Sequence, residues 1–399
     1  MLVSLTKQGK LINAVKNSRT QLLELRRQEV FYCPECGEDV SLKVGTKKIP
    51  HFAHKQGSAC SESYERESEY HLSGKLRLFQ WLETKGVSPK LEPYYKDIAQ
   101  RPDIGFAYNG VEYAIEYQCS TIPEELFIKR TEAYLLANIT PIWIRAGKSM
   151  KRKGSTQAVL SGFDYLFLSN MLSNQWTVLG FCPITNEFIS LQQILPYSAK
   201  NVISKFNVKP LQKTALSDLL QPIHSSPVNS NIWMHEIRKA KTITIPLYGS
   251  MKNKFLQELY VNRLSPSLLP PEIGLPVYHG VHIETSPIEW QSYIFIDSLT
   301  TRKDLSLESI LHAFSKRVRN KDIKLRNLPL SKGGSAAKAV QEYITLLNSI
   351  QVLEPAGENY IRKKRPIIIA ENQKDHLENE RIFYKKYGKI IMTSIKPNG

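Results

Sequence analysis

One stretch of the sequence decides the fold of the central part of the chain: Arg101-Pro102-Asp103-Ile104-Gly105-Phe106-Ala107-Tyr108-Asn109-Gly110-Val111-Glu112-Tyr113-Ala114-Ile115-Glu116-Tyr117-Gln118. Asn109-Gly110 is the preferred centre of a two-residue type I′ turn, so a β-hairpin is predicted with strands at 101–108 and 111–120. In that register Asp103 lies opposite Glu116, with their Cβ atoms about 5 Å apart. Like charges at this distance repel by about 3 kcal/mol. A divalent cation between the carboxylates reverses the sign of this energy, so the hairpin predicts a cation site.

Gln118 follows Glu116 by two residues and therefore projects from the same face of the predicted sheet. Ile104 and Ile115 occupy the opposite face, where an apolar core would cover them. The other interpretation is an ordinary polar sheet face that carries two carboxylates and binds no ion. The hairpin alone does not choose between the two interpretations.

A helix predicted at 64–84 precedes this hairpin. Its apolar stripe is formed by Leu72, Leu76, Phe79 and Leu82. At about 100° per residue, Glu69 falls at the edge of this stripe and Lys75 falls inside it. Taken alone, Lys75 would extend its amine to solvent and Glu69 would favour the helix dipole. Convergence on one site is the more economical explanation for Glu69, Asp103, Glu116 and Gln118.

Metal-ligand residue types concentrate near the N-terminus, at Cys33, Cys36, His51, His54 and Cys60. The Cys-x2-Cys pair places two thiolates on one tight turn, and tetrahedral zinc needs four ligands, so four of these five are predicted to bind Zn²⁺. No open position for chemistry is indicated, so the site is interpreted as structural. The alternative is a pair of buried reduced cysteines with two incidental histidines.

The composition narrows the class of protein. The chain has 399 residues, 42% of them hydrophobic, and a formal net charge of +17, which excludes a disordered or collagen-like chain. The excess of cations lies mainly in residues 151–399, which favours a polyanionic partner there. No run of 18 apolar residues occurs and the first residues lack the pattern of a signal peptide. A cytoplasmic protein without a membrane span is expected.

A second helix is predicted from Thr121 to about Asn138, because Thr121-x-x-Glu124 is a capping-box pattern. An apolar strand follows at 140–145. The predicted order of helix, three strands, helix and strand resembles the PD-(D/E)XK nuclease core. The stretch from Phe31 to Ile144 also resembles the competence protein CoiA family. The blocks that carry this resemblance are Cys33-Pro34-x-Cys36-Gly37, His51-Phe52-Ala53-His54, Glu69-x-His71-x3-Lys75, Arg101-Pro102-Asp103, Ile115-Glu116-Tyr117-Gln118-Cys119-Ser120, Arg130-x3-Tyr134 and Ile142-Trp143-Ile144.

The resemblance implies a multidomain α/β (α+β) protein. Residues 1–62 are expected to form a zinc-ribbon-like module and residues 63–150 a PD-(D/E)XK nuclease-like domain, similar to restriction endonucleases. A basic Gly/Ser stretch at 145–155 is the predicted linker. Residues 155–399 are expected to form a mainly helical, basic C-terminal domain. Its predicted DNA contacts are Lys316, Arg317 and Arg319, whose alternative role is a solvated surface.

The resemblance further implies a nuclease-like protein that acts on DNA during natural transformation in the cytoplasm of a Gram-positive bacterium. Asp103, Glu116 and Glu69 map to the acids that hold Mg²⁺ or Mn²⁺. Gln118 stands where these nucleases have lysine, and Lys75 could supply the missing charge. Arg130 and Tyr134 share a helix face and either contact the DNA or the acidic site, or simply pack on each other.

Single-stranded or branched DNA and the recombinase machinery are the expected partners. Two other functions stay open at this point. The nuclease core could persist only as a fold, in a scaffold that binds DNA and recruits recombination proteins, and Gln118 favours this interpretation. The zinc ribbon and the basic tail could also form an RNA-binding module, although no base-stacking aromatic pattern singles it out.

Overall fold

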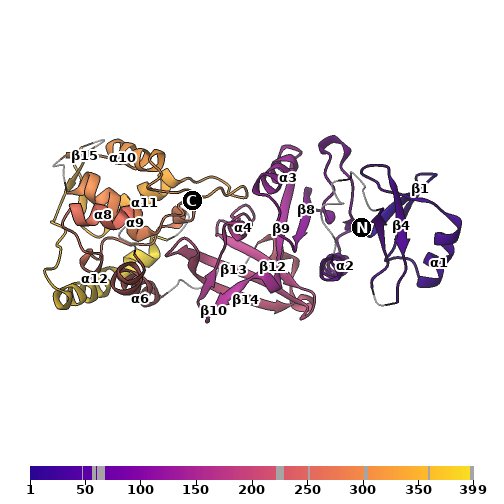
Figure 1. The fold of residues 1–399 in the computed structure, drawn as a ribbon, viewed down its shortest axis with the longest axis horizontal. Helices are drawn as coiled ribbons and strands as arrows, with labels where there is room; N and C mark the ends of the chain where they lie inside the picture. Colours follow the sequence, from indigo (N-terminus) through magenta and orange to yellow (C-terminus); the bar gives the residue numbers. More distant parts are fainter. Residues whose placement is uncertain are drawn as a thin grey trace. The chain divides into compact units, whose positions relative to one another are not determined.

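The hairpin at the centre of the sequence forms as predicted. The computed structural model describes residues 1–46, 48–55, 60, 68–221, 229–249, 252–300, 304–357 and 360–395 (Figure 1). Strands β7 (Ile104–Tyr108) and β8 (Val111–Gln118) pair antiparallel, with Ile104 opposite Ile115 and Tyr108 opposite Val111. Asn109 and Gly110 have φ of 50° and 76°, the left-handed values that a type I′ turn requires.

The chain divides into two compact units. Unit 1 comprises residues 1–150, 178–190 and 207–222, and unit 2 comprises residues 151–177, 191–206 and 223–399. The predicted linker at 145–155 contains the first passage between the units, and the predicted boundary at residue 62 lies outside the described residues. Within the described part of the chain, no helix is both long and apolar enough to cross a membrane.

The N-terminal part of unit 1 is a five-stranded sheet with the strand order β2-β1-β3-β4-β5. A helix that was not predicted, α1 (Arg19–Gln28), adds Leu22 to its core, and a Ser18–Gln21 capping box begins this helix. Phe31 and Phe52 pack in the same core, with ring centroids 5.1 Å apart. The strands are β1 (Val3–Thr6), β2 (Leu11–Asn13), β3 (Phe31–Tyr32), β4 (Asp39–Lys43) and β5 (His51–His54).

The rest of unit 1 contains a run of strands in the order β12-β9-β8-β7-β6. Strands β8, β9 (Ile139–Ala146) and β12 (Thr177–Cys182) are parallel, and β7 is antiparallel to β8. The predicted helices are observed as α2 (Glu69–Thr84) and α3 (Glu124–Leu136). The capping box predicted at Thr121 is not formed, because Pro123 is the N-cap residue of α3 and no side chain caps the helix. Further elements are β6 (Lys90–Leu91), the 3₁₀ turns at Lys96–Ile98, Gly147–Ser149 and Leu211–Lys213, β13 (Glu187–Pro196), which continues into unit 2, and α5 (Leu216–Leu220).

Helices α2 and α3 cover opposite faces of strand β8. Tyr117 packs against Gly74 of α2, while the neighbouring Glu116 is contacted by Tyr134 of α3. Successive side chains of a strand point to opposite faces, so the two helices must lie on different sides of the sheet. Phe127 of α3 stacks on Trp143 of β9, with ring centroids 3.8 Å apart, and fixes the helix to the sheet.

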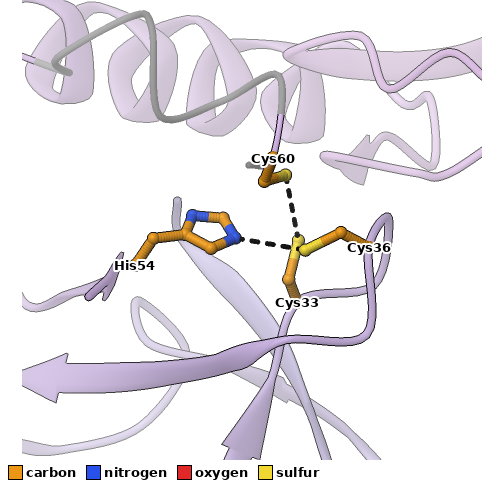
Figure 2. Close-up of side chains that lie close together, drawn as sticks. All are labelled: Cys33, Cys36, His54 and Cys60. Carbon is orange, nitrogen blue, oxygen red and sulfur yellow. Dashed lines mark hydrogen bonds between the residues drawn. The ribbon is translucent and has the colours of Figure 1, made fainter. Parts of the chain in front are cut away.

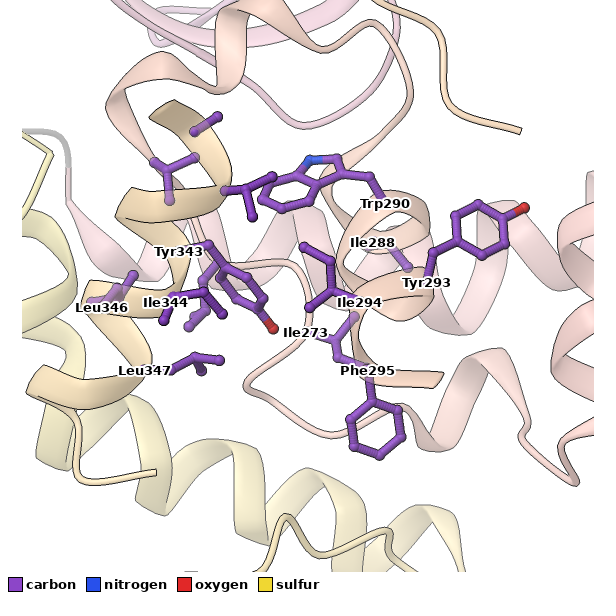
Figure 3. Close-up of a cluster of buried hydrophobic side chains, with 14 of the residues drawn as sticks. Ile273, Ile288, Trp290, Tyr293, Ile294, Phe295, Tyr343, Ile344, Leu346 and Leu347 are labelled. Carbon is purple, nitrogen blue, oxygen red and sulfur yellow. The ribbon is translucent and has the colours of Figure 1, made fainter. Parts of the chain in front are cut away.

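Unit 2 has strands β10 (Lys151–Lys153), β11 (Gln157–Val159) and β14 (Asn201–Pro210, of which residues 201–206 belong to this unit) in the order β10-β11-β14. Its large apolar core lies among the helices, where Trp290 meets Tyr343 edge-on at 5.4 Å (Figure 3). The helices are α4 (Gly162–Tyr165), α6 (Ser230–Lys239), α7 (Ile245–Tyr248), α8 (Lys254–Val261), α9 (Pro287–Ile294), α10 (Leu307–Arg319), α11 (Ala336–Ser349) and α12 (Gln373–Thr393).

Two π-helical segments extend α6 and α9, at Ala240–Thr244 and Phe295–Leu299, and 3₁₀ turns lie at Pro266–Leu268 and Tyr278–His282. A small sheet with the order β15-β17-β16 completes unit 2. Its strands are β15 (Asp304–Ser306), β16 (Leu353–Pro355) and β17 (Tyr360–Lys363). Helices therefore dominate the described residues after 229, as expected from the sequence.

The close approach of α2 to the sheet requires glycine at position 74. A Cβ atom there would lie 2.0 Å from Cε1 of Tyr117, whose buried hydroxyl donates to the Phe181 carbonyl at 3.0 Å. Gly74→Ala is therefore expected to destabilise the protein by about 1–3 kcal/mol, although alanine in a helix is normally better than glycine. Urea unfolding measures this change. Gly45→Ala is the control, because its Cβ meets nothing within 4 Å; equal effects of both substitutions would contradict the packing.

Candidate functional site

Four of the five predicted metal ligands converge in the N-terminal module. One ligand atom from each of Cys33, Cys36, His54 and Cys60 lies within 4.8 Å of the others (Figure 2). The Cys36 thiol lies 3.4 Å from Nε2 of His54, and the two sulfur atoms of Cys33 and Cys60 lie 4.0 Å apart. Three thiols and one imidazole are the donor set of a tetrahedral site for a soft or borderline metal ion. The cluster could therefore hold a metal ion.

His51 is the predicted ligand that this cluster leaves out. Its Nδ1 atom lies 2.8 Å from the Ile49 carbonyl oxygen. His51 and His54 are three residues apart on strand β5, so their side chains point to opposite faces of the sheet. The alternation of the strand thus selects one histidine of the pair.

Asp103 lies at the start of β7, where two cationic side chains of α2 meet it. Its Oδ1 atom is 2.9 Å from Nζ of Lys75, and its Oδ2 atom is 3.2 Å from Nε2 of His71. The backbone N–H of Tyr117 also donates to Oδ2 at 2.8 Å. Spacings of four residues place His71 and Lys75 on the same face of α2, so the helix presents both to one carboxylate.

The pKa of the Asp103 carboxyl lies well below its usual range. Burial opposes the charged form, but the nearby charges of Lys75 and His71 and their hydrogen bonds outweigh that effect. Asp103 is therefore ionised at every physiological pH. The side chain keeps 12% of its surface exposed, so this carboxylate is accessible from one side.

Lys75 is buried between two carboxylates. Its Nζ atom lies 2.6 Å from Oε1 of Glu92 and 2.9 Å from Asp103, and its side chain is only 2% exposed. Glu92 has a left-handed φ of 48° and also accepts hydrogen bonds from the backbone N–H groups of Leu2 and Val3. The charge of Lys75 thus links α2, the start of β7 and the first strand of the N-terminal module.

Glu116 has a different set of partners, on α3. Arg130 donates to its Oε1 atom at 2.6 Å and the Tyr134 hydroxyl donates to the same atom at 2.5 Å. The expected face-to-face carboxylate pair is therefore not formed. The register of the hairpin is as predicted, but Asp103 precedes the first residue of β7 and its carboxylate is contacted from α2. The two acids consequently interact with helices on opposite faces of the sheet.

The other predicted site residues occupy separate positions. Gln118 is buried and its amide donates to the carbonyl and hydroxyl oxygens of Ser120, at 3.1 and 3.2 Å. Glu69 is exposed in the first turn of α2. Among the described residues, the group of potential metal ligands that the structure brings together is the cysteine and histidine cluster, and Glu69, Asp103 and Glu116 are not part of such a group.

The predicted basic cluster of α10 is partly neutralised by its own chain. Arg317 forms ion pairs with Asp297 at 2.7 Å, Glu258 at 2.9 Å and Asp322 at 3.4 Å. The hydrogen bond to Asp297 is the largest reason why the pKa of Arg317 is raised. Lys316 and Arg319 are exposed. Of the three predicted DNA contacts, Arg317 is thus held in an intramolecular network.

Sequence reasoning missed two residues that organise this region, Glu92 and Arg101. Arg101 is buried, and its guanidinium lies 3.9 Å from the Cys33 sulfur and 3.7 Å from a Glu35 oxygen. It lies two residues before Asp103 and so connects the metal-ligand cluster to the acidic site. The Arg-Pro-Asp block was the available signal for Arg101, whereas no sequence pattern marks Glu92.

Comparisons with known proteins identify the class of protein as one with a nuclease-like domain. Residues 67–224 match the family model described as the nuclease-like domain of competence protein CoiA. The models of the CoiA N-terminal and C-terminal domains match residues 14–63 and 228–377. Competence protein CoiA of Bacillus subtilis strain 168 is 30% identical over 375 residues, which cover 93% of this chain and 98% of the relative.

The chain therefore belongs to the competence protein CoiA family, and the resemblance inferred from its sequence blocks is confirmed. No solved structure matches the chain.

The buried position of Lys75 predicts a large effect on stability. Lys75→Met should lower the free energy of unfolding at neutral pH by about 3–5 kcal/mol, because two buried carboxylates would lose their common cation. Arg77→Met is the control, because Arg77 is exposed on the same helix. Urea unfolding of both variants and the wild type measures the difference, and a similar, small effect of both substitutions would contradict the buried pairing.

The same pairing predicts the direction of a pH effect. The folded-state pKa of Asp103 is lowered, so its contribution to stability is complete above the unfolded-state pKa of about 4 and is lost as the pH falls further. The difference in stability between the wild type and Lys75→Met should therefore narrow below about pH 4. A difference that stays constant from pH 7 to pH 3 would count against this ion pair.

Proposed function

We propose that this protein is a metal-dependent DNA nuclease that processes single-stranded or branched DNA in the cytoplasm during natural transformation, alongside the recombinase machinery. The observation that carries the proposal is the contact between Lys75 and Asp103 at 2.9 Å. Gln118 replaces the usual lysine of the nuclease motif, and Lys75 brings a positive charge to the acidic site from another element. The membership of the CoiA family and its nuclease-like domain support the same conclusion.

The donor chemistry suits a hard divalent cation. Asp103 carries the carboxylate oxygens that Mg²⁺ and Mn²⁺ prefer, and Glu69 offers an exposed carboxylate at the start of α2. Glu116 would have to leave its partners on α3 to share the same ion. When bound, such an ion activates water and neutralises charge on the phosphate. Lys75 keeps Asp103 ionised, and the Nε2 atom of His71 can hold or release a proton beside Oδ2 of Asp103.

A second candidate is a DNA-binding scaffold that recruits recombination proteins and does not cleave DNA. The observation in its favour is that each acid already has cationic partners in the chain. Glu116 is bound by Arg130 and Tyr134, and Asp103 by Lys75 and His71. In this function the nuclease-like core would serve only to hold the domain together.

One assay separates the two candidates. The full chain is incubated with single-stranded, duplex and branched DNA in Mg²⁺ or Mn²⁺, alongside Asp103→Asn, Glu116→Gln and the control Asp97→Asn, whose carboxylate is exposed. The nuclease predicts cleavage by the wild type and the control, and a loss of roughly 100-fold or more in Asp103→Asn. Binding without cleavage would support the scaffold, and cleavage that survives both site substitutions would place the activity elsewhere.

We further propose that the Cys33, Cys36, His54 and Cys60 cluster binds Zn²⁺ as a structural ion. The four protein ligands fill a tetrahedral shell, which leaves no position for a reacting water molecule. The small five-stranded module has a modest apolar core, so an ion that joins β3, β5 and the segment at residue 60 would add much of its stability.

The two neighbouring histidines provide a matched test of this site. Elemental analysis should find about one zinc ion per chain in the wild type and in His51→Ala, and a clear loss in His54→Ala. Cys33→Ser should lose the ion as well and lower the melting temperature. Equal zinc content in the two histidine variants would contradict the selection of His54, and its absence from the wild type would contradict the zinc site.

A further inference from the structure

Strand β10 is a short run of three consecutive cations, Lys151, Arg152 and Lys153, and all three side chains are exposed. The strand pairs with β11 on one side and ends the order β10-β11-β14, so its other edge carries no partner strand among the described residues. The sequence suggested only a linker at this position. The structure instead makes it a positively charged edge of a sheet.

Among the described residues, none of these three cations forms an ion pair with a carboxylate, in contrast to Arg317 with its three. Lys205 lies on the same face of the sheet as Lys153. The register places Lys153, Gln157 and Ile203 in one row across β10, β11 and β14. Lys205 follows Ile203 by two residues and therefore points to the same face. Lys205 is also exposed. The charge of this edge is therefore available to a ligand.

An aromatic ring accompanies the cations. The Arg152 guanidinium lies 5.2 Å from the centroid of the half-buried Phe206 ring, and its Nε donates to the Gly154 carbonyl at 2.7 Å. These contacts fix the guanidinium plane beside the ring. By the same register, Phe206 shares a face of the sheet with Arg152, and the three lysines lie on the other face. A strand bound along this edge would therefore meet cations on both faces and the ring on one. Cations that hold the backbone and an aromatic ring that stacks a base are the combination that binds single-stranded nucleic acid.

We propose that β10, together with Phe206 and Lys205, binds single-stranded DNA. Lys151 and Lys153 are two residues apart on a strand, so both project from one face of the sheet about 7 Å apart. The surface is separate from the residues assigned to cleavage. It rests on the proposed function only for the choice of DNA as the polyanion.

Charged residues on an edge strand have another common role, which is to prevent the edge from pairing with another chain. That role requires the cations but neither the Arg152–Phe206 contact nor any affinity for DNA. It predicts aggregation when the cations are removed. The two roles therefore lead to different measurements on the same variant.

The test uses the full chain and a fluorescein-labelled oligo-dT of about 30 nucleotides, without added Mg²⁺ or Mn²⁺. The variant combines Lys151→Gln, Arg152→Gln and Lys153→Gln. The control combines Lys385→Gln, Lys386→Gln and Lys389→Gln, which removes the same charge from exposed positions of α12. The β10 variant should bind at least tenfold more weakly. The negative slope of its log affinity against log salt concentration should become shallower by about 2. The control should change much less.

Phe206→Leu tests the aromatic contribution and should weaken binding about tenfold with little change in the salt slope. Equal losses in the β10 variant and its control, an unchanged salt slope, or stronger binding of a duplex of the same length would overturn the proposal. Aggregation of the β10 variant with unchanged DNA affinity would identify edge protection as the role of the cations. Because binding is read without turnover, a protein that binds through β10 but never cleaves DNA would refute the nuclease alone.

Discussion

The buried ammonium group of Lys75 is the interaction on which the candidate site depends. It joins Asp103 at the start of β7 to Glu92, and Glu92 in turn binds the backbone of β1. A buried charge is tolerated only when its partners are in place, so these segments must assemble together. Close packing of α2, which needs Gly74 beneath Tyr117, brings the ammonium group to this depth. The same buried ion pairs therefore form the acidic site and connect the N-terminal sheet to the nuclease-like domain.

The alternation of strand β8 explains why the two acids have separate partners. Glu116 and Tyr117 point to opposite faces, so one acid is tied to α3 and the region around Asp103 is tied to α2. A chain that held both carboxylates on one face would carry a strong repulsion in the absence of an ion. Here each carboxylate has its own counter-charge within the chain. The same arrangement obliges any divalent cation to compete with lysine and arginine.

Local patterns in the sequence predicted a large part of this structure. The Asn-Gly turn fixed the register of β7 and β8, and the apolar stripe located α2. The predicted second helix exists, but the capping box did not locate its start, because α3 begins after Pro123 without a side-chain cap. The ligand cluster was predicted from spacing, although the alternation of β5 would already have separated His51 from His54. Lys75 near the acids, and Arg130 and Tyr134 in contact with the acidic site, were among the sequence expectations. The division of Asp103 and Glu116 between two helices and the role of Glu92 were not predicted, because they depend on where a strand begins and on a left-handed residue. Long-range pairings, such as β12 beside β9, leave no local signal.

The two units share the chain in such a way that unit 1 cannot complete its fold until part of unit 2 has also been synthesised. Unit 1 needs β12 beside β9 and the carbonyl of Thr214, to which the buried Trp81 indole donates at 3.1 Å. More than half of the chain must therefore leave the exit tunnel before unit 1 can be complete. Until then the edge of β9 and the indole of Trp81 lack their partners, and a nascent chain in that state is exposed to misassembly. The nuclease-like domain can therefore complete its fold only after residues 178–190 and 207–222 have been synthesised and have packed against the earlier part of unit 1.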